Sequence, residues 1–295
     1  MSENIIKALD TDIKSYRITN TKYVLTILIV FLHCFPHADT LNGPSHIYSV
    51  LDDGLKMVCD AATPAFFAIA SYLFFKNFVI EKYMNKLTMR FKSLVIPFVL
   101  FQIIAFIVPA IKLLIIRGQF NHVAFNDFIL GINHQQYNPP LWFLITLFEF
   151  ALIAPAIWVL LKKCGGRGAL IAGLFFYLIN FIEKTPYISL SFWMPVIIWG
   201  AYMGFREYEG KKSLWDIPWY YGLIYFLAFL LTFFFWGGDY SGNVYYTYRL
   251  IGGALIILLL GGGKIQTIWV SKLYDVCILY TLVSKFVYSF IYTQK

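Results

Sequence analysis

Nine long apolar runs, each bounded by charged residues or by Gly and Pro clusters, divide this chain of 295 residues. They lie at about 23–37, 55–75, 93–112, 141–161, 168–182, 188–205, 217–236, 246–261 and 273–292. A helix of about 20 apolar residues crosses the hydrocarbon core of a bilayer. Only 14% of the residues are charged, whereas soluble domains carry about 25%, so the composition excludes an ordinary soluble globule. The runs therefore predict an all-α, polytopic helical membrane protein with nine or ten transmembrane helices.

Basic residues are unevenly distributed among the segments that join these runs. If the N-terminus is cytoplasmic, 17 of the 24 Lys and Arg residues fall in inner segments and 4 in outer segments. Cytoplasmic loops of helical membrane proteins carry such an excess. We therefore expect a multi-pass protein of the cell membrane, with a cytoplasmic N-terminal segment over 1–22 and a single transmembrane domain over 23–295. The same bias explains the net charge of +8, so no nucleic-acid partner is expected.

Several other classes of protein find no support in the sequence. The four cysteines form no CxxC pair and no metal-ligand spacing, so neither a disulfide framework nor a metal site is expected. Residues 1–22 are polar and hold no apolar stretch followed by a cleavage site, so no removable signal peptide is expected.

Lys22 and His33 bracket the first apolar run, in the stretch KYVLTILIVFLH. Eleven helical steps of about 100° return to within roughly 20° of the starting direction, so the two side chains share one face at opposite depths. A His that faces an interior cavity near the outer end of such a helix can act as a general base toward a hydroxyl. The residues alone leave a second interpretation open, in which Lys22 is an inner anchor and His33 a polar end of the helix.

Three further stretches follow in order: PAFFAIASYLF at 64–74, MRFKSLVIPFVLF at 89–101 and PLWFLITLF at 140–148. Together with a basic residue, ten residues and then a His in the first run, they resemble the acyltransferase 3 family, the membrane O-acyltransferases of surface polysaccharides and related glycans. The pair Arg17-Ile18 before this run also resembles the family pattern. A tenth span, usual in the family, would need a break in one of the long runs.

The chain also departs from the family pattern. Lys22 stands where the family usually has Arg, and Lys lacks the planar fork of a guanidinium. Ala70-Ser71-Tyr72 replaces a Ser-Gly-aromatic triplet, and the last run, LYDVCILYTLVSKF, has no His. These departures keep a catalytically degenerate family member open as an alternative.

The resemblance implies an integral membrane enzyme that takes an acyl group, with acetyl expected, from acyl-coenzyme A on the inner side. The acceptor it implies is a hydroxyl of a glycan or glycolipid on the outer side. His33 would be the general base or would briefly carry the acyl chain, and Lys22 would fix the inner end of the shared polar track. Acyl-coenzyme A, or acetyl-coenzyme A, is thus a donor substrate, no bound cofactor is expected, and the lipid bilayer is the remaining partner.

Two charged residues, Asp60 and Arg249, lie in the outer third of their predicted spans. Asp60 has the spacing for an ion pair with Lys56 or for a catalytic role beside His33. Arg249 could bind an anionic or sugar group, or could extend to the membrane surface. From depth alone we predict that His33, Asp60 and Arg249 converge in one outer pocket.

Other candidates come from the outer loops and the middle of the membrane. His134, in NHQQYNPP, and Trp142, in the LWFL stretch, are candidate acceptor-binding residues, although a plain loop histidine and an interfacial tryptophan are the alternatives. Glu149 lies too deep in its span to reach the surface, and we expect it to pair with Lys285 of the last span.

Lys86, Arg90 and Lys92 form the densest inner basic cluster. Such side chains donate charge-assisted hydrogen bonds to phosphate oxygens, so the cluster is the candidate binding site for acyl-coenzyme A, and the charge bias of inner loops is the alternative. A membrane transporter or glycan export component stays open as a rival function, because intramembrane charges also line transport paths.

Overall fold

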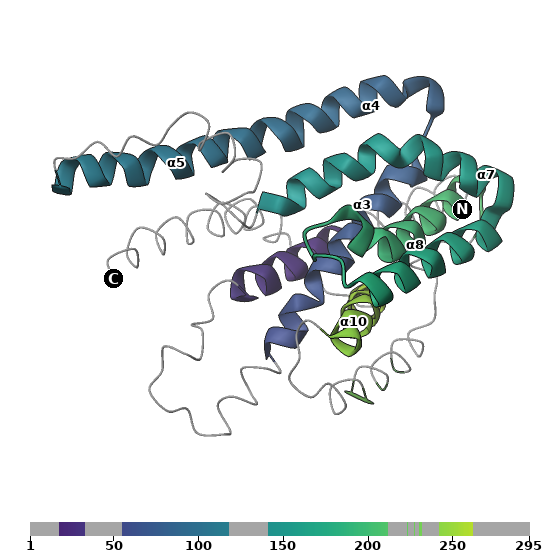
Figure 1. The fold of residues 1–295 in the computed structure, drawn as a ribbon. Coiled ribbons are helices and arrows are strands. Elements are labelled where there is room, and N and C mark those ends of the chain that lie inside the picture. Colours follow the sequence, from purple (N-terminus) through teal and green to yellow (C-terminus); the bar gives the residue numbers. More distant parts are fainter. Residues whose placement is uncertain are drawn as a thin grey trace, which may run out of the picture. The chain divides into compact units, whose positions relative to one another are not determined.

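The computed structural model describes residues 18–32, 55–117, 141–211 and 242–261, together with positions 223, 227, 230 and 231. Every regular element bounded within these ranges is a helix (Figure 1). Three of them are long and apolar enough to cross a membrane: Leu55–Lys76, Ile80–Ile107 and Trp142–Glu183. The all-helical class is therefore confirmed for the described residues, and three helices have the length and composition of membrane spans. The number of spans stays a prediction, because the run at 273–292 lies outside the described residues and only four positions of 217–236 lie within them.

The observed helices coincide with the predicted runs. One run or more is overlapped by each of the N-terminal helix Ile18–Leu32, α3 (Ala62–Lys76), α5 (Ile96–Arg117), α7 (Trp142–Glu183), α8 (Leu190–Tyr208) and α10 (Asn243–Gly261). The chain forms two compact units, and each is described by itself. The first unit holds the described residues up to Phe78, then 157–187 and those from 191 onward. The second holds 79–156 and 188–190.

Helix α3 is the centre of the first unit. It buries residues on every side of the helix, as an all-apolar sequence without an amphipathic stripe predicts. Its core contacts come from the N-terminal helix and from α10, and the buried cluster consists of Ile18, Leu25, Ala62, Ala65, Ala68, Ile69, Tyr72 and Ile257. A helix surrounded in this way is fixed at both ends by its neighbours.

Glycines of α8 and α10 let both helices approach the backbone of α3. Gly200 and Gly204, a GxxxG pair on α8, lie against backbone atoms of α3, and a Cβ on Gly204 would come within 2.9 Å of the Lys76 nitrogen. On α10, a Cβ at Gly253 would come within 2.8 Å of Pro64. Small residues at membrane helix interfaces permit this close packing, which gains dispersion contacts where no hydrophobic effect operates.

Contacts at the two ends of α3 give the relative directions of these helices. The first two turns of α10 meet Asp60 just before α3, whereas Glu207 near the end of α8 meets Lys76 at the end of α3. The α8 residue Trp193, one turn into its helix, stacks on Phe67. Helices α3, α8 and α10 therefore run parallel, as strict alternation of spans two, six and eight requires.

The long helix α7 reverses at Gly165 (Figure 1). Its 42 residues would extend about 63 Å, twice the thickness of a bilayer core, so one straight span is excluded. Gly165 has φ 54° and ψ −139°, a conformation that a residue with a Cβ rarely adopts. The sequence predicted a six-residue loop at 162–167 between two spans. In the structure the helix continues on both sides of Gly165, so this residue alone interrupts it.

In the second unit a nearly continuous helical run begins at η2 (Ile80–Lys82) and continues through α4 (Tyr83–Arg90), a π-helical turn η3 (Phe91–Val95) and α5. The predicted inner loop at 76–92 is thus mostly helical. Helix α5 exposes an apolar stripe with helical spacing that suits a lipid environment: Ile96, Val99, Leu100, Ile104, Ile107, Ile111 and Ile115.

Candidate functional site

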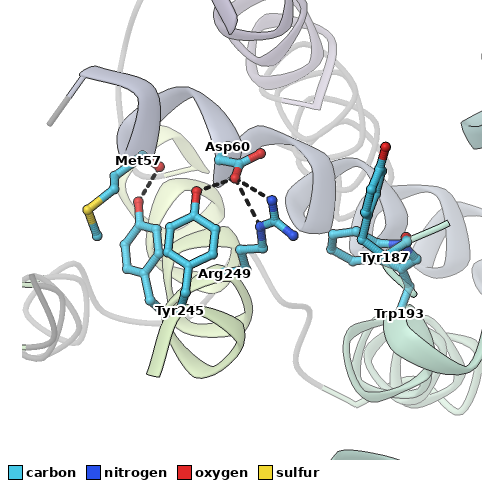
Figure 2. Close-up of polar contacts among 7 residues, drawn as sticks. Met57, Asp60, Tyr187, Trp193, Tyr245 and Arg249 are labelled. Carbon is cyan, nitrogen blue, oxygen red and sulfur yellow. Dashed lines mark hydrogen bonds and ion pairs between the residues drawn. The ribbon is translucent and has the colours of Figure 1, made fainter. Parts of the chain in front are cut away.

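A buried ion pair joins the start of the second span to α10. The Nε and Nη2 atoms of Arg249 donate to Oδ2 of Asp60 at 2.9 and 2.7 Å (Figure 2). The side chains are only 17% and 13% exposed, so Arg249 does not extend to the membrane surface. Two members of the predicted outer pocket, Asp60 and Arg249, are therefore in contact, whereas His33 lies outside the described residues and the pocket itself stays a prediction. A paired carboxylate and guanidinium form a neutral unit, which lowers the cost of placing either charge inside a membrane.

Two tyrosines complete this centre. Tyr245 donates its hydroxyl to the Asp60 carboxylate, and its ring lies 4.7 Å from the guanidinium carbon of Arg249. Tyr248 donates to the carbonyl of Met57, one turn before Asp60. Asp60 therefore accepts from two residues of α10, and the ring of Tyr245 adds a cation–π contact to Arg249. We call Asp60, Tyr245 and Arg249 the Asp60 centre.

Close packing brings the Asp60 centre together. A Cβ on Gly252 would lie 2.9 Å from the Cβ of Ala61, so the two backbones meet directly beside Asp60. Arg249 and Gly252 are three residues apart and lie on the same face of α10, as does Gly253 at four residues. The glycines thus bring α10 close enough for the short reach from Tyr245 and Arg249 to the carboxylate.

A second polar network holds the start of α10 through the neighbouring residue Tyr246. Asn180 near the end of α7 is 3% exposed, and its Nδ2 lies 3.1 Å from the hydroxyl of Tyr246 and 2.8 Å from the carbonyl of Ser191. Pro195 removes the helical donor that this carbonyl would otherwise receive. Thr185 donates to Oδ1 of Asn180. One buried amide therefore links the end of α7 to the first turns of α8 and α10.

The basic cluster lies on α4 and the following π-helical turn, in the second unit. Lys86 and Arg90 are four residues apart on one half-buried face of α4, whereas Lys92 is exposed on another face. Tyr83, on the half-buried face, donates to the carbonyl of Ala151 at 3.1 Å. Pro155 removes the helical donor of that carbonyl, so Tyr83 satisfies it and fixes α4 to α7.

Other predicted site residues are placed as follows. Lys22 is half-buried in the N-terminal helix, and its carbonyl accepts from Thr26 at 2.9 Å. Trp142 begins α7 and is half-buried, with its carbonyl accepting from Thr146. Three predicted residues, His33, His134 and Lys285, lie outside the described residues. The predicted pairing of Glu149 with Lys285 therefore stays a prediction.

Sequence reasoning missed the tyrosines and Asn180. The stretch YYTYR at 245–249 holds the signal, because hydroxyl-bearing rings at a membrane helix need partners when buried. The GxxxG pair at 200 and 204 marks a helix interface in the same way.

Comparison with known proteins gives one match. A family model described as an acyltransferase domain matches residues 15–290, nearly the whole chain. Searches of curated proteins and of solved structures found no match.

Proposed function

We propose that this chain, which belongs to the acyltransferase 3 family, moves an acetyl group from acetyl-coenzyme A on the inner side of the cell membrane to a glycan hydroxyl on the outer side. The match over residues 15–290 supports acyltransferase activity. The Asp60 centre supports an acceptor site near the outer ends of α3 and α10. A glycan offers hydroxyls that bond to guanidinium and carboxylate groups alike.

In the proposed reaction the acceptor hydroxyl attacks the thioester carbonyl carbon. An ester bond forms, the carbon–sulfur bond breaks, and the coenzyme A thiolate leaves. His33 takes the hydroxyl proton and returns it to the thiolate, so that charges balance over the cycle. The Asp60 centre holds the acceptor, because Arg249 carries five N–H donors and directs only two bonds at Asp60.

The donor is proposed to bind at α4. Lys86 and Arg90 present their charges from one face, and together they match a phosphate group of coenzyme A. The hydrogen bond from Tyr83 to Ala151 holds this face against α7. Lys92 lies on another face and would contribute through its charge at longer range.

The buried Asp60–Arg249 pair is the single observation that carries the acceptor assignment. A purely structural pair at this place would leave catalysis unchanged when both charges are replaced, and a substrate-binding pair would not. That difference makes the assignment testable.

The test uses the full chain purified into lipid nanodiscs, with radiolabelled acetyl-coenzyme A as donor. The acceptor probe is surface polysaccharide extracted from the producing cells and freed of O-acyl groups with mild alkali. We expect base-labile label on the polysaccharide, and a KM for acetyl-coenzyme A raised about tenfold in Lys86→Ala and Arg90→Ala, the loss of one charge-assisted contact. Lys163→Ala, which removes an exposed lysine of α7, serves as the matched control and should leave this KM unchanged.

Absence of label on the polysaccharide, with consumption of acetyl-coenzyme A also absent, would contradict the proposal and favour the transporter. Equal KM values in Lys86→Ala, Arg90→Ala and Lys163→Ala would remove the donor site from α4 while leaving the reaction in place.

A further inference from the structure

A rigid turn joins α7 to α8 at the end of the bundle where the Asp60 centre lies. The amide nitrogen of Lys184 bonds to the carbonyl of Asn180 at 3.0 Å, and the hydroxyl of Thr185 bonds to the side chain of the same residue. The indole of Trp193 donates to the carbonyl of Tyr187 at 2.6 Å. Three bonds therefore fix a stretch of six residues.

The anchor of this turn is buried. Trp193 is 1% exposed, stacks on Phe67 of α3 at 5.2 Å between ring centroids, and packs edge-on against Phe192. Phe192 in turn contacts the ring of Tyr246 in the first turn of α10. The turn and the start of α10, which contains Arg249, thus pack against the same cluster of aromatic rings.

Tyr187 is exposed on this fixed turn. The residue is 51% exposed, whereas its backbone carbonyl is held by a hydrogen bond from the buried indole of Trp193. Figure 2 shows Tyr187 on the side of the Arg249 guanidinium opposite Tyr245. Binding of a ligand to an exposed ring costs conformational entropy, because the side chain and its backbone become ordered. A backbone that is already fixed lowers this entropy cost.

We propose that Tyr187 is an acceptor-binding residue that packs its ring against the apolar face of a sugar ring, while the Asp60 centre bonds to the sugar hydroxyls. Ligand sites combine aromatic surfaces with a few convergent polar groups, and this end of the bundle supplies both. The inference rests on the proposed function and names the chemical class of its acceptor: a pyranose ring with one hydrophobic face.

The experiment compares Tyr187→Ala with Tyr208→Ala as a matched control. Both tyrosines are 51% exposed, and Tyr208 lies at the other end of α8. Transfer of radiolabelled acetyl groups to the de-O-acylated polysaccharide is measured in nanodiscs while acceptor and donor concentrations are varied. Binding of the same polysaccharide to each variant is measured by surface plasmon resonance, which needs no turnover.

We expect Tyr187→Ala to raise the KM for the acceptor and the Kd of the polysaccharide by about tenfold, the loss of one aromatic contact. The values of kcat and of KM for acetyl-coenzyme A should stay within about twofold, because an interaction made equally in the ground and transition states was removed. Tyr187→Phe should behave nearly as wild type, and Tyr208→Ala should change neither acceptor value.

Unchanged acceptor KM and Kd in Tyr187→Ala, with an active parent protein, would overturn the inference and leave the proposed function standing. A loss of thermal stability without a change in acceptor affinity would also overturn it, and would make Tyr187 an interfacial anchor. If the parent protein binds the polysaccharide without transferring acetyl groups, the proposed function fails while weakened binding by Tyr187→Ala still supports the acceptor contact.

Discussion

Breaking the Asp60–Arg249 pair separates its structural role from its chemical role. Asp60→Asn keeps the shape of the side chain but leaves Arg249 as an uncompensated charge. Two unit charges about 4 Å apart attract by about 4 kcal/mol at an effective dielectric constant of 20. Removal of one partner from a buried pair typically destabilises by about 3–5 kcal/mol. The two N···O distances of 2.9 and 2.7 Å, with exposures of 17% and 13%, place this pair in that class.

We therefore expect Asp60→Asn to lower the apparent Tm in nanodiscs by roughly 6–20 °C, at about 2–4 °C for each kcal/mol. The double variant Asp60→Leu/Arg249→Met removes both charges, and such replacements are often neutral. It still leaves the buried hydroxyl of Tyr245 without its carboxylate, which costs about 1–3 kcal/mol. Addition of Tyr245→Phe should recover that part, while acetyl transfer stays lost in all three variants.

The chain offers a matched control at the other end of α3. Glu207 accepts from Tyr72 and pairs with Lys76 at 2.8 Å, so a tyrosine, a carboxylate and a cation repeat the composition of the Asp60 centre. Glu207→Gln should lower Tm in the same way and leave transfer per folded molecule unchanged. Near-normal transfer by Asp60→Leu/Arg249→Met would refute the acceptor role, and a double variant as unstable as Asp60→Asn would refute the electrostatic reasoning.

Further predictions concern the first span, the helix packing and the topology. His33→Ala should lower acetyl transfer by about 10²–10⁴-fold with membrane insertion intact, whereas Lys22→Arg keeps activity and Lys22→Ala impairs it, measured on purified variants at matched expression; near-normal transfer by His33→Ala would contradict its role. Gly253→Val should lower Tm strongly because its side chain meets Pro64, whereas Gly173→Ala, which meets nothing within 4 Å, should be neutral or stabilising by thermal unfolding; equal effects would contradict the packing account. Met84→Cys, at a residue 67% exposed, should react in a cysteine-free background with a membrane-impermeant maleimide only after the cells are opened, and reaction in intact cells would reverse the assigned topology.

The sequence was sufficient to predict the long apolar helices, although not α4, because each apolar run needs only its own residues to satisfy its backbone in lipid. The run at 55–75 and the run at 188–205 appear as helices within a few residues of their predicted ends. The break near 162–167 was also predicted, from its charges and glycines, although its narrowness at Gly165 was not. Hydropathy describes one segment at a time, so it succeeds for such features.

Contacts between spans were less accessible. Depth along each helix predicted that Asp60 and Arg249 meet, and an ion pair of Asp60 with Lys56 stayed open beside a catalytic role, because helix order in the bundle does not follow from one sequence. The structure makes Arg249 the partner through Gly252 and Gly253, whose absent side chains bring α10 against α3. The contact between α3 and α10 therefore depended on two glycines, and a search for catalytic side chains does not consider glycines.

Prolines explain why polar residues distant in sequence became neighbours. Pro155 leaves the carbonyl of Ala151 without its helical donor, and Tyr83 supplies one. Pro195 has the same effect on the carbonyl of Ser191, and Asn180 supplies the donor. In lipid an unsatisfied carbonyl costs several kcal/mol, so each proline in a span demands a partner from elsewhere in the chain. The two side chains that donate to these carbonyls also lie beside the two candidate sites. Tyr83 is on the same helix as Lys86 and Arg90. Asn180 bonds to Tyr246 beside the Asp60 centre. The same side chains thus satisfy the backbone and fix the geometry of the candidate sites. Asn180, which bonds to Tyr246 and has no assigned catalytic role, should therefore affect the acceptor site through the position of α10.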